Sequence, residues 1–176
     1  ICNEFDMKIK IKDQLPDTEI FQLVDGEPQK SKLRETIGNG KVVLFGLPGA
    51  FTSTCSKLHL PGFVANADKI KAKGIENIFC LSANDPYVMN GWGEINNTGD
   101  KIKMLSDPYL LFTKSIGAAV DRNAKGMGIR SNRYLMVIEN FTVINIHVEK
   151  ETKECGLTSA ENLLNNLLEK KTETEK

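Results

Sequence analysis

The sequence lacks the marks of several large classes of protein. No apolar run approaches the roughly 18 residues that a membrane-spanning helix needs. The start Ile1-Cys2-Asn3-Glu4 has neither the basic nor the apolar segment of a signal peptide. An excess of charge of either sign is also missing, because 23 Lys and Arg balance 23 Asp and Glu. We therefore expect no membrane partner and no nucleic-acid partner.

Cysteine and histidine are scarce, with 4 Cys and 2 His in the chain. No two cysteines form a C-x-x-C pair, which excludes the usual zinc spacings and argues against a dense disulfide scaffold. We expect no metal and no other cofactor, and we expect His59 and His147 to pack at the surface or at an interface. Reduced thiols favour a cytoplasmic location, or a mitochondrion or other organelle if a targeting segment was removed before Ile1.

What is present is the composition of an ordinary globular protein. With 176 residues, of which 40% are hydrophobic and 26% charged, the chain predicts a single domain over residues 1–176, with a frayed polar tail at 170–176. Apolar runs and helical stripes alternate along it. The predicted strands are 42–47, 75–82, 102–105, 134–139 and 142–148, and the predicted helical segments are 61–73, 86–92 and 163–168.

This alternation predicts an α/β domain whose ligand site lies at the carboxyl ends of the central strands. The segment Pro48-Gly49-Ala50-Phe51-Thr52-Ser53-Thr54-Cys55 follows the apolar strand 42–47 directly. It therefore lies at that edge, with Cys55 in the first turn of the next helix.

A thiol at this place can act as a nucleophile only if it is partly ionised, with a pKa below the free value of about 8.5. A helix N-terminus contributes at most about 2 kcal/mol, whereas lowering the pKa of a thiol by two to three units takes roughly 3–4 kcal/mol. A cation must therefore assist. Lys57 and His59 lie on the helix that points away, so we expect an arginine from elsewhere in the chain. The candidates are Arg34, Arg122, Arg130 and Arg133.

Two neighbours of Cys55 fit a reactive site. Thr52 lies one helical turn before it, so the hydroxyl can face the same pocket, and Pro48, which has no backbone N–H, can shield the thiolate. The plainer interpretation is a strand-to-helix turn at Pro48, a helix cap at Thr52 and a buried, inert Cys55. The residues alone leave both interpretations open.

The segment 48–56 resembles the active-site signature of peroxiredoxins, in particular the type II, peroxiredoxin-five-like subfamily that includes one-cysteine and atypical two-cysteine enzymes. One departure is Ser53, where relatives more often carry Pro or Gly. The likeness extends over roughly residues 13–168. Its further segments are 59–63, 82–89, 106–108, 112–114 and 128–134.

The resemblance implies a thioredoxin fold, with a central mixed β-sheet flanked by helices, and a homodimer with a contact near Phe51 and Trp92. It implies that Cys55 attacks the peroxide, that Pro48, Thr52 and Arg133 complete the catalytic site, and that Arg130 supports it. Core packing is the alternative for Trp92.

Two other cysteines are candidates to resolve the oxidised Cys55. Cys80 lies in an apolar strand, where a thiol is most often core filler, although plant-type members resemble the chain there. Cys155 lies in a charged stretch that reads as an exposed loop. Animal members place a resolving cysteine near this loop, but after the Gly-Leu-Thr of residues 156–158 and not before it.

Together these features predict a thiol-dependent peroxidase for hydrogen peroxide and organic hydroperoxides. Its Cys55 thiolate becomes a sulfenic acid, which glutathione with glutaredoxin, or thioredoxin, then reduces. One alternative is a redox sensor or holdase-like binding protein that is switched by oxidation of Cys55. Another is a disulfide oxidoreductase, which is disfavoured because Thr52 stands where the first Cys of a C-x-x-C pair would be.

Overall fold

The computed structural model describes residues 7–150 and 155–168, with the backbone alone at Cys55 and Ser56. The strands are β1 (Glu19–Val24), β2 (Glu27–Lys32), β3 (Lys41–Gly46), β4 (Asn77–Ser82), β5 (Lys103–Ser106), β6 (Ala119–Asp121), β7 (Ile129–Ser131), β8 (Tyr134–Glu139) and β9 (Thr142–Val148). The helices are α1 (Leu33–Ile37), α2 (Leu60–Ala72), α3 (Pro86–Ile95), α4 (Leu111–Ser115) and α5 (Ala160–Asn162), with π-helical turns η1 (Cys55–His59) and η3 (Leu163–Leu167) and a 3-10 turn η2 (Asn123–Lys125).

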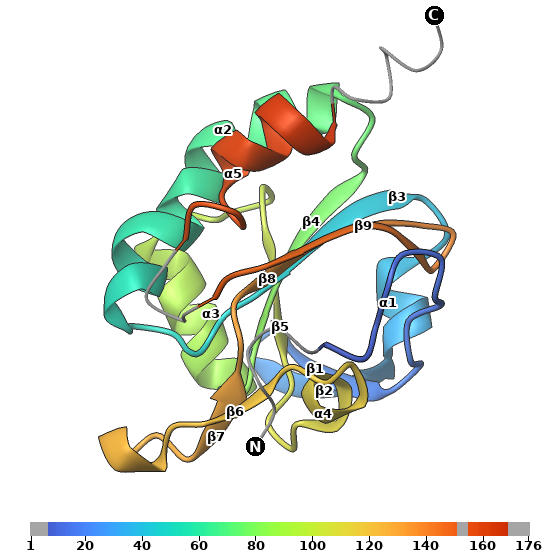
Figure 1. Ribbon diagram of the computed structural model, residues 1–176. Coiled ribbons are helices and arrows are strands. Elements are labelled where there is room, and N and C mark those ends of the chain that lie inside the picture. The colour runs from blue at the N-terminus through green and yellow to red at the C-terminus, as the bar shows by residue number, and fades with distance from the viewer. Residues whose placement is uncertain (1–6, 151–154, 169–176) are drawn as a thin grey trace, which may run out of the picture.

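A mixed sheet runs through the middle of the molecule in the order β2-β1-β5-β4-β3-β8-β9 (Figure 1). The central strands β3, β4 and β5 are parallel, whereas β8 and β1 pair antiparallel on either side of them. A small antiparallel ribbon, β6–β7, stands apart from this sheet. The predicted α/β class with a central mixed sheet is confirmed.

Helices cover both faces of the sheet, so the central strands are apolar on both sides. Val43 and Phe45 of β3 face the layer of α2, α3 and α5, while Val42 and Leu44 face the layer of α1 and α4. All four side chains are fully buried. In the described part of the chain, no helix is long and apolar enough to cross a membrane.

The predicted strands at 42–47, 75–82, 102–105, 134–139 and 142–148 are confirmed within two residues as β3, β4, β5, β8 and β9. Helix 61–73 is α2, and helix 86–92 extends to Ile95 as α3. Asn140 and Phe141 turn the β8–β9 hairpin with φ of 53° and 60°. The leucine stripe at 163–168 forms a π-helical turn and not a regular helix. The predicted frayed tail, 170–176, lies outside the described residues.

Candidate active site

The segment that joins β3 to η1 lies where the parallel strands β3 and β4 end at the same edge of the sheet. Asn84, just beyond β4, accepts a hydrogen bond at its Oδ1 from the backbone N of Ala50 at 2.8 Å, and Ser82 Oγ donates to the same oxygen at 2.7 Å. Phe51 has a φ of 65°, a left-handed conformation that a bulky residue rarely adopts. A hydrogen bond to Asn84, which lies outside the loop, therefore helps to hold it in this unusual conformation.

Thr52 ends this loop, and helical backbone begins at Ser53. The Thr52 hydroxyl donates to the carbonyl oxygen of Gly49 at 2.7 Å. Because its proton is committed to that carbonyl, the hydroxyl oxygen keeps its lone pairs for a donor in the cavity beside it.

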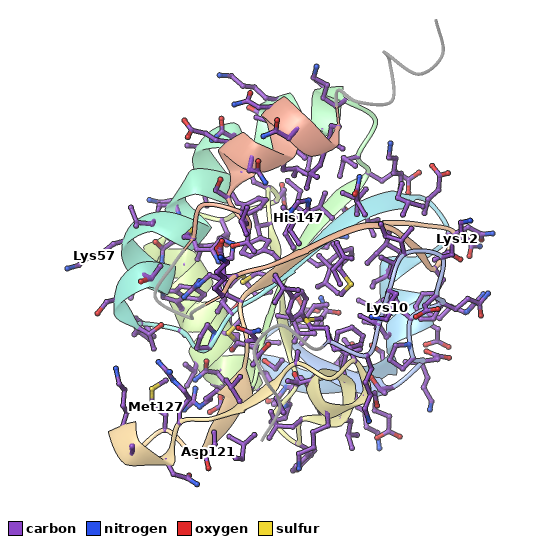
Figure 2. All side chains as sticks on the ribbon, viewed as in Figure 1. Lys10, Lys12, Lys57, Asp121, Met127 and His147 are labelled. Atoms are coloured by element: carbon purple, nitrogen blue, oxygen red, sulfur yellow. The ribbon has the colours of Figure 1, made fainter. Side chains whose placement is uncertain are left out.

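A partly open cavity of about 460 Å³ lies over this loop and the start of the helix. It brings together Pro48, Thr52 and Arg133, three of the residues predicted for the site. Its full lining is Pro48, Phe51, Thr52, Ser53, Thr54, Arg122, Lys125, Met127 and Arg133. In Figure 2, Met127 projects from the β6–β7 ribbon toward the start of α2, whereas Lys57 points away into solvent.

Arg133 is the cation of the cavity that is buried most deeply, with 1% of its surface exposed. Its Nη1 donates to Nδ1 of His59 at 2.7 Å, and the other ring nitrogen, Nε2, donates to the carbonyl oxygen of Thr158 at 3.0 Å. Burial and the neighbouring Arg133 charge lower the pKa of His59 from 6.5 to about 3. The neutral ring therefore restrains the guanidinium without cancelling its charge.

The expectation that His59 packs at the surface is wrong, because the side chain is 1% exposed. It packs against Phe45 and Phe63, with ring centroids 4.9 and 5.6 Å from its own. His59 lies four residues after Cys55, at the end of the π-helical turn, and there it contacts Phe45 of β3 and Arg133.

Arg130 does not line the cavity, but it binds the loop between β3 and η1. Its Nη1 donates to the carbonyl oxygen of Pro48 at 3.3 Å, and its Nε donates to the carbonyl oxygen of Met127 at 2.8 Å. A Cβ added at Gly49 would lie 2.7 Å from that Nη1. Arg130 thus ties the β6–β7 ribbon to the loop, while Arg34 stacks over Phe141, 4.6 Å from the ring centroid, at the helix α1.

The three cysteines of interest occupy different surroundings. Cys55 opens η1 directly after Thr54 of the cavity, and its side chain lies outside the described part of the structure. Cys80 is fully buried in β4, opposite Phe45 of β3. Cys155, expected in an exposed loop, is half-buried.

Sequence reasoning missed Lys125, Met127 and Asn84 as residues of this site. Arg122 was one of four candidate arginines, and no feature of the sequence favoured it over the other three. Asn84 lies in the motif at 82–89 that the family resemblance already covered, but only the fold shows what it binds. Among the described residues, no group of three or more His, Cys, Asp or Glu could hold a metal ion.

Comparison with known proteins decides the family. The profile of the Redoxin family matches residues 10–164. Peroxiredoxin-2D of Arabidopsis thaliana is 38% identical over 157 residues, which are 89% of this chain and 96% of that protein. The chain belongs to the peroxiredoxin family. Peroxiredoxin-2C of Oryza sativa subsp. japonica is similar at 38% identity over 158 residues, with 89% and 96% covered.

Solved peroxiredoxins share the fold. Reduced Prx3 of Vibrio vulnificus in complex with H2O2 superposes with a TM-score of 0.86 at 40% identity, covering 92% of this chain and 99% of that one. The Plasmodium falciparum antioxidant protein, a 1-Cys peroxiredoxin, gives a TM-score of 0.82 at 28% identity, covering 90% and 98%. This peroxiredoxin therefore has the thioredoxin fold and is a thiol-dependent peroxidase.

Proposed function

We propose that Cys55 is the thiol that attacks peroxide. The observation that carries this is the cavity beside Thr54, in which Pro48, Thr52 and the buried Arg133 meet. The Cys55 thiolate attacks one oxygen of R–O–O–H and the O–O bond breaks. Sulfur keeps that oxygen as a sulfenic acid, while RO⁻ takes up a proton and leaves as alcohol, or as water when R is hydrogen.

Arg133, Thr52 and Pro48 each have a role in this step. The charge of Arg133 stabilises the thiolate and the oxygen that becomes negative, in a place where little water screens it. The hydroxyl oxygen of Thr52 accepts a hydrogen bond from the peroxide O–H, since the Thr52 proton is already donated to the carbonyl oxygen of Gly49. Pro48 covers the site and offers no N–H that would compete for the thiolate.

The test is Cys55→Ser, because an alcohol is not appreciably ionised at neutral pH and Ser is nearly the same size as Cys. Peroxide turnover should disappear while far-ultraviolet circular dichroism stays that of the wild type. Cys155→Ser, which also replaces a thiol by a hydroxyl, is the matched control and should retain turnover. Activity of Cys55→Ser above about a tenth of wild type would refute the assignment.

We further propose that an external thiol, either glutathione with glutaredoxin or thioredoxin, reduces the Cys55 sulfenate. A disulfide needs Cα atoms within about 7 Å and correctly aimed Cβ atoms. Cys80 lies fully buried in the central sheet, so it would meet Cys55 only if β4 separated from its neighbours. A small thiol needs no such opening. The likeness to the 1-Cys protein of Plasmodium falciparum supports this proposal.

To test it, the reduced protein is treated with one equivalent of peroxide and its disulfides are mapped by peptide mass spectrometry. We expect Cys55 sulfenate, trapped by a dimedone reagent, and no rapid bond from Cys55 to Cys80 or Cys155. Stoichiometric formation of either bond within one chain would make this an atypical two-cysteine enzyme and refute the external-thiol proposal.

A further inference from the structure

The cavity beside Thr54 contains more positive charge than the peroxidase step requires. Besides Arg133, it is lined by Arg122 and Lys125, which come from the connection between β6 and β7. None of the described residues that line the cavity is acidic. The wall formed by the β6–β7 connection is therefore suited to an anion.

Arg122 is the better placed of the two new cations. Its Nε is buried and has no hydrogen-bond partner in the described residues. A buried N–H without an acceptor is destabilising, so an acceptor brought by a ligand would remove that cost. Because a guanidinium is planar and rigid, it can bind both oxygens of a carboxylate through two parallel hydrogen bonds.

The backbone around Arg122 is ordered by its own hydrogen bonds. Arg122 N donates to the carbonyl oxygen of Gly128 at 2.7 Å, and the carbonyl oxygen of Arg122 accepts from the N of Lys125 and Met127 at 3.0 and 3.2 Å. Arg130 ties the same connection to Pro48. The backbone that carries the two cations is therefore fixed relative to the loop that contains Pro48.

We propose that Arg122 and Lys125 bind the carboxylate of an organic co-substrate whose other end reacts at Cys55, so that this proposal rests on the assignment of Cys55. A cavity of about 460 Å³ is far larger than hydrogen peroxide needs and falls in the range of small organic ligands. Pro48, Phe51 and Met127 add apolar side chains to its lining.

Two co-substrates carry this chemistry. In an acid hydroperoxide, the O–O bond breaks, Cys55 becomes the sulfenic acid and a hydroxy acid leaves. In an acid thiol, sulfur attacks the Cys55 sulfenic acid, a mixed disulfide forms and water leaves. The carboxylate reacts in neither step and only positions the molecule.

The experiment uses matched pairs in both half-reactions. One arm measures oxidation of the reduced protein by linoleic acid hydroperoxide and by its methyl ester, below their micelle concentrations. The other arm measures reduction of the oxidised protein by 3-mercaptopropionate and by its methyl ester. Each pair is tested on the wild type, Arg122→Met, Lys125→Met and the double variant. Lys101→Met, which removes a charge from an exposed turn, is the control.

In at least one arm, the acid-to-ester rate ratio should fall about tenfold in Arg122→Met, further in the double variant and not in Lys101→Met. The arm that responds identifies the co-substrate as hydroperoxide or thiol. Unchanged ratios in both arms would overturn the proposal. Failure of the underlying assignment is recognised separately, because Cys55→Ser would then still react with both hydroperoxides.

Discussion

Arg133 is a cation with 1% of its surface exposed, and a buried charge is costly unless other groups hold and compensate it. His59 is one such group. Its Nε2 donates to Thr158, so Nδ1 is left with a lone pair for Arg133. A carboxylate in that place would hold the guanidinium equally well but would neutralise it. A neutral imidazole holds the guanidinium without adding a negative charge beside it, as the proposed role of Arg133 requires.

We expect Arg133→Met to shift the midpoint of the pH profile for alkylation of Cys55 by iodoacetamide upward, and to slow the reaction with peroxide. His59→Leu should have a smaller effect of the same sign, because Arg133 keeps its charge but loses the hydrogen bond that orients its guanidinium. His59→Gln, which restores an acceptor, should recover part of the rate. Arg34→Met is the matched control at α1. An unchanged profile in Arg133→Met would move the role to Arg122 or Arg130.

At the scale of elements, the loop between β3 and η1 depends on contacts from other parts of the chain. Leu47 N donates to Leu81 of β4 at 3.2 Å, Ala50 N donates to Asn84, and Pro48 accepts from Arg130. Phe51 meanwhile keeps its left-handed φ. Residues of and next to β4 and the β6–β7 ribbon therefore help to shape the loop, in addition to its internal bond from Thr52 to Gly49.

Asn84→Ala should leave the N–H of Ala50 and the hydroxyl of Ser82 without their shared acceptor. We expect a loss of about 1–3 kcal/mol in the free energy of unfolding, since buried polar groups would remain unsatisfied. The peroxide rate constant should fall as well, because the loop that carries Pro48 and Thr52 loosens. Asn90→Ala is the control, since Asn90 bonds to Glu94 at an exposed site. Loss of stability with a wild-type rate constant would show that the loop does not depend on Asn84.

Patterning explains which elements were foreseen. The strands β3, β4, β8 and β9 could be predicted because apolar residues that pack into the core recur in their sequences. The β1–β2 hairpin was missed since β2 is nearly all exposed and has the polar sequence Glu-Pro-Gln-Lys-Ser-Lys. The ribbon β6–β7 was missed because each strand has only 3 residues. Neither contains a periodicity long enough to detect.

At the scale of the whole molecule, His59 links stability to pH. Desolvation by burial is the main cause of its low pKa, the charge of Arg133 adds to it, and the bond to Thr158 opposes it. The pKa is 6.5 in the unfolded chain and about 3 in the folded protein. Between these values the unfolded chain binds a proton that the folded protein does not. Stability therefore falls as pH falls through this window, by about 1.4 kcal/mol per pH unit.

Urea unfolding at pH 7 and pH 5 measures this contribution. Of the stability that the wild type loses between these two pH values, about 2 kcal/mol should be absent in His59→Gln. His147→Gln, in the half-buried part of β9, should keep most of the wild-type pH dependence. Equal losses in the wild type and His59→Gln would show that His59 is protonated in the folded protein at pH 5.

The sequence by itself determined the α/β class, the central strands, and the position of Pro48–Cys55 at the carboxyl end of β3, because these follow from local patterns of apolar residues and turns. Only the tertiary structure decided which arginines reach the cavity and the loop beside it. Arg133 and His59 are 74 residues apart, and Arg130 and Pro48 are 82 apart. A charged side chain carries no periodicity that reveals its partner, so its partner is determined only when distant strands and loops pack together.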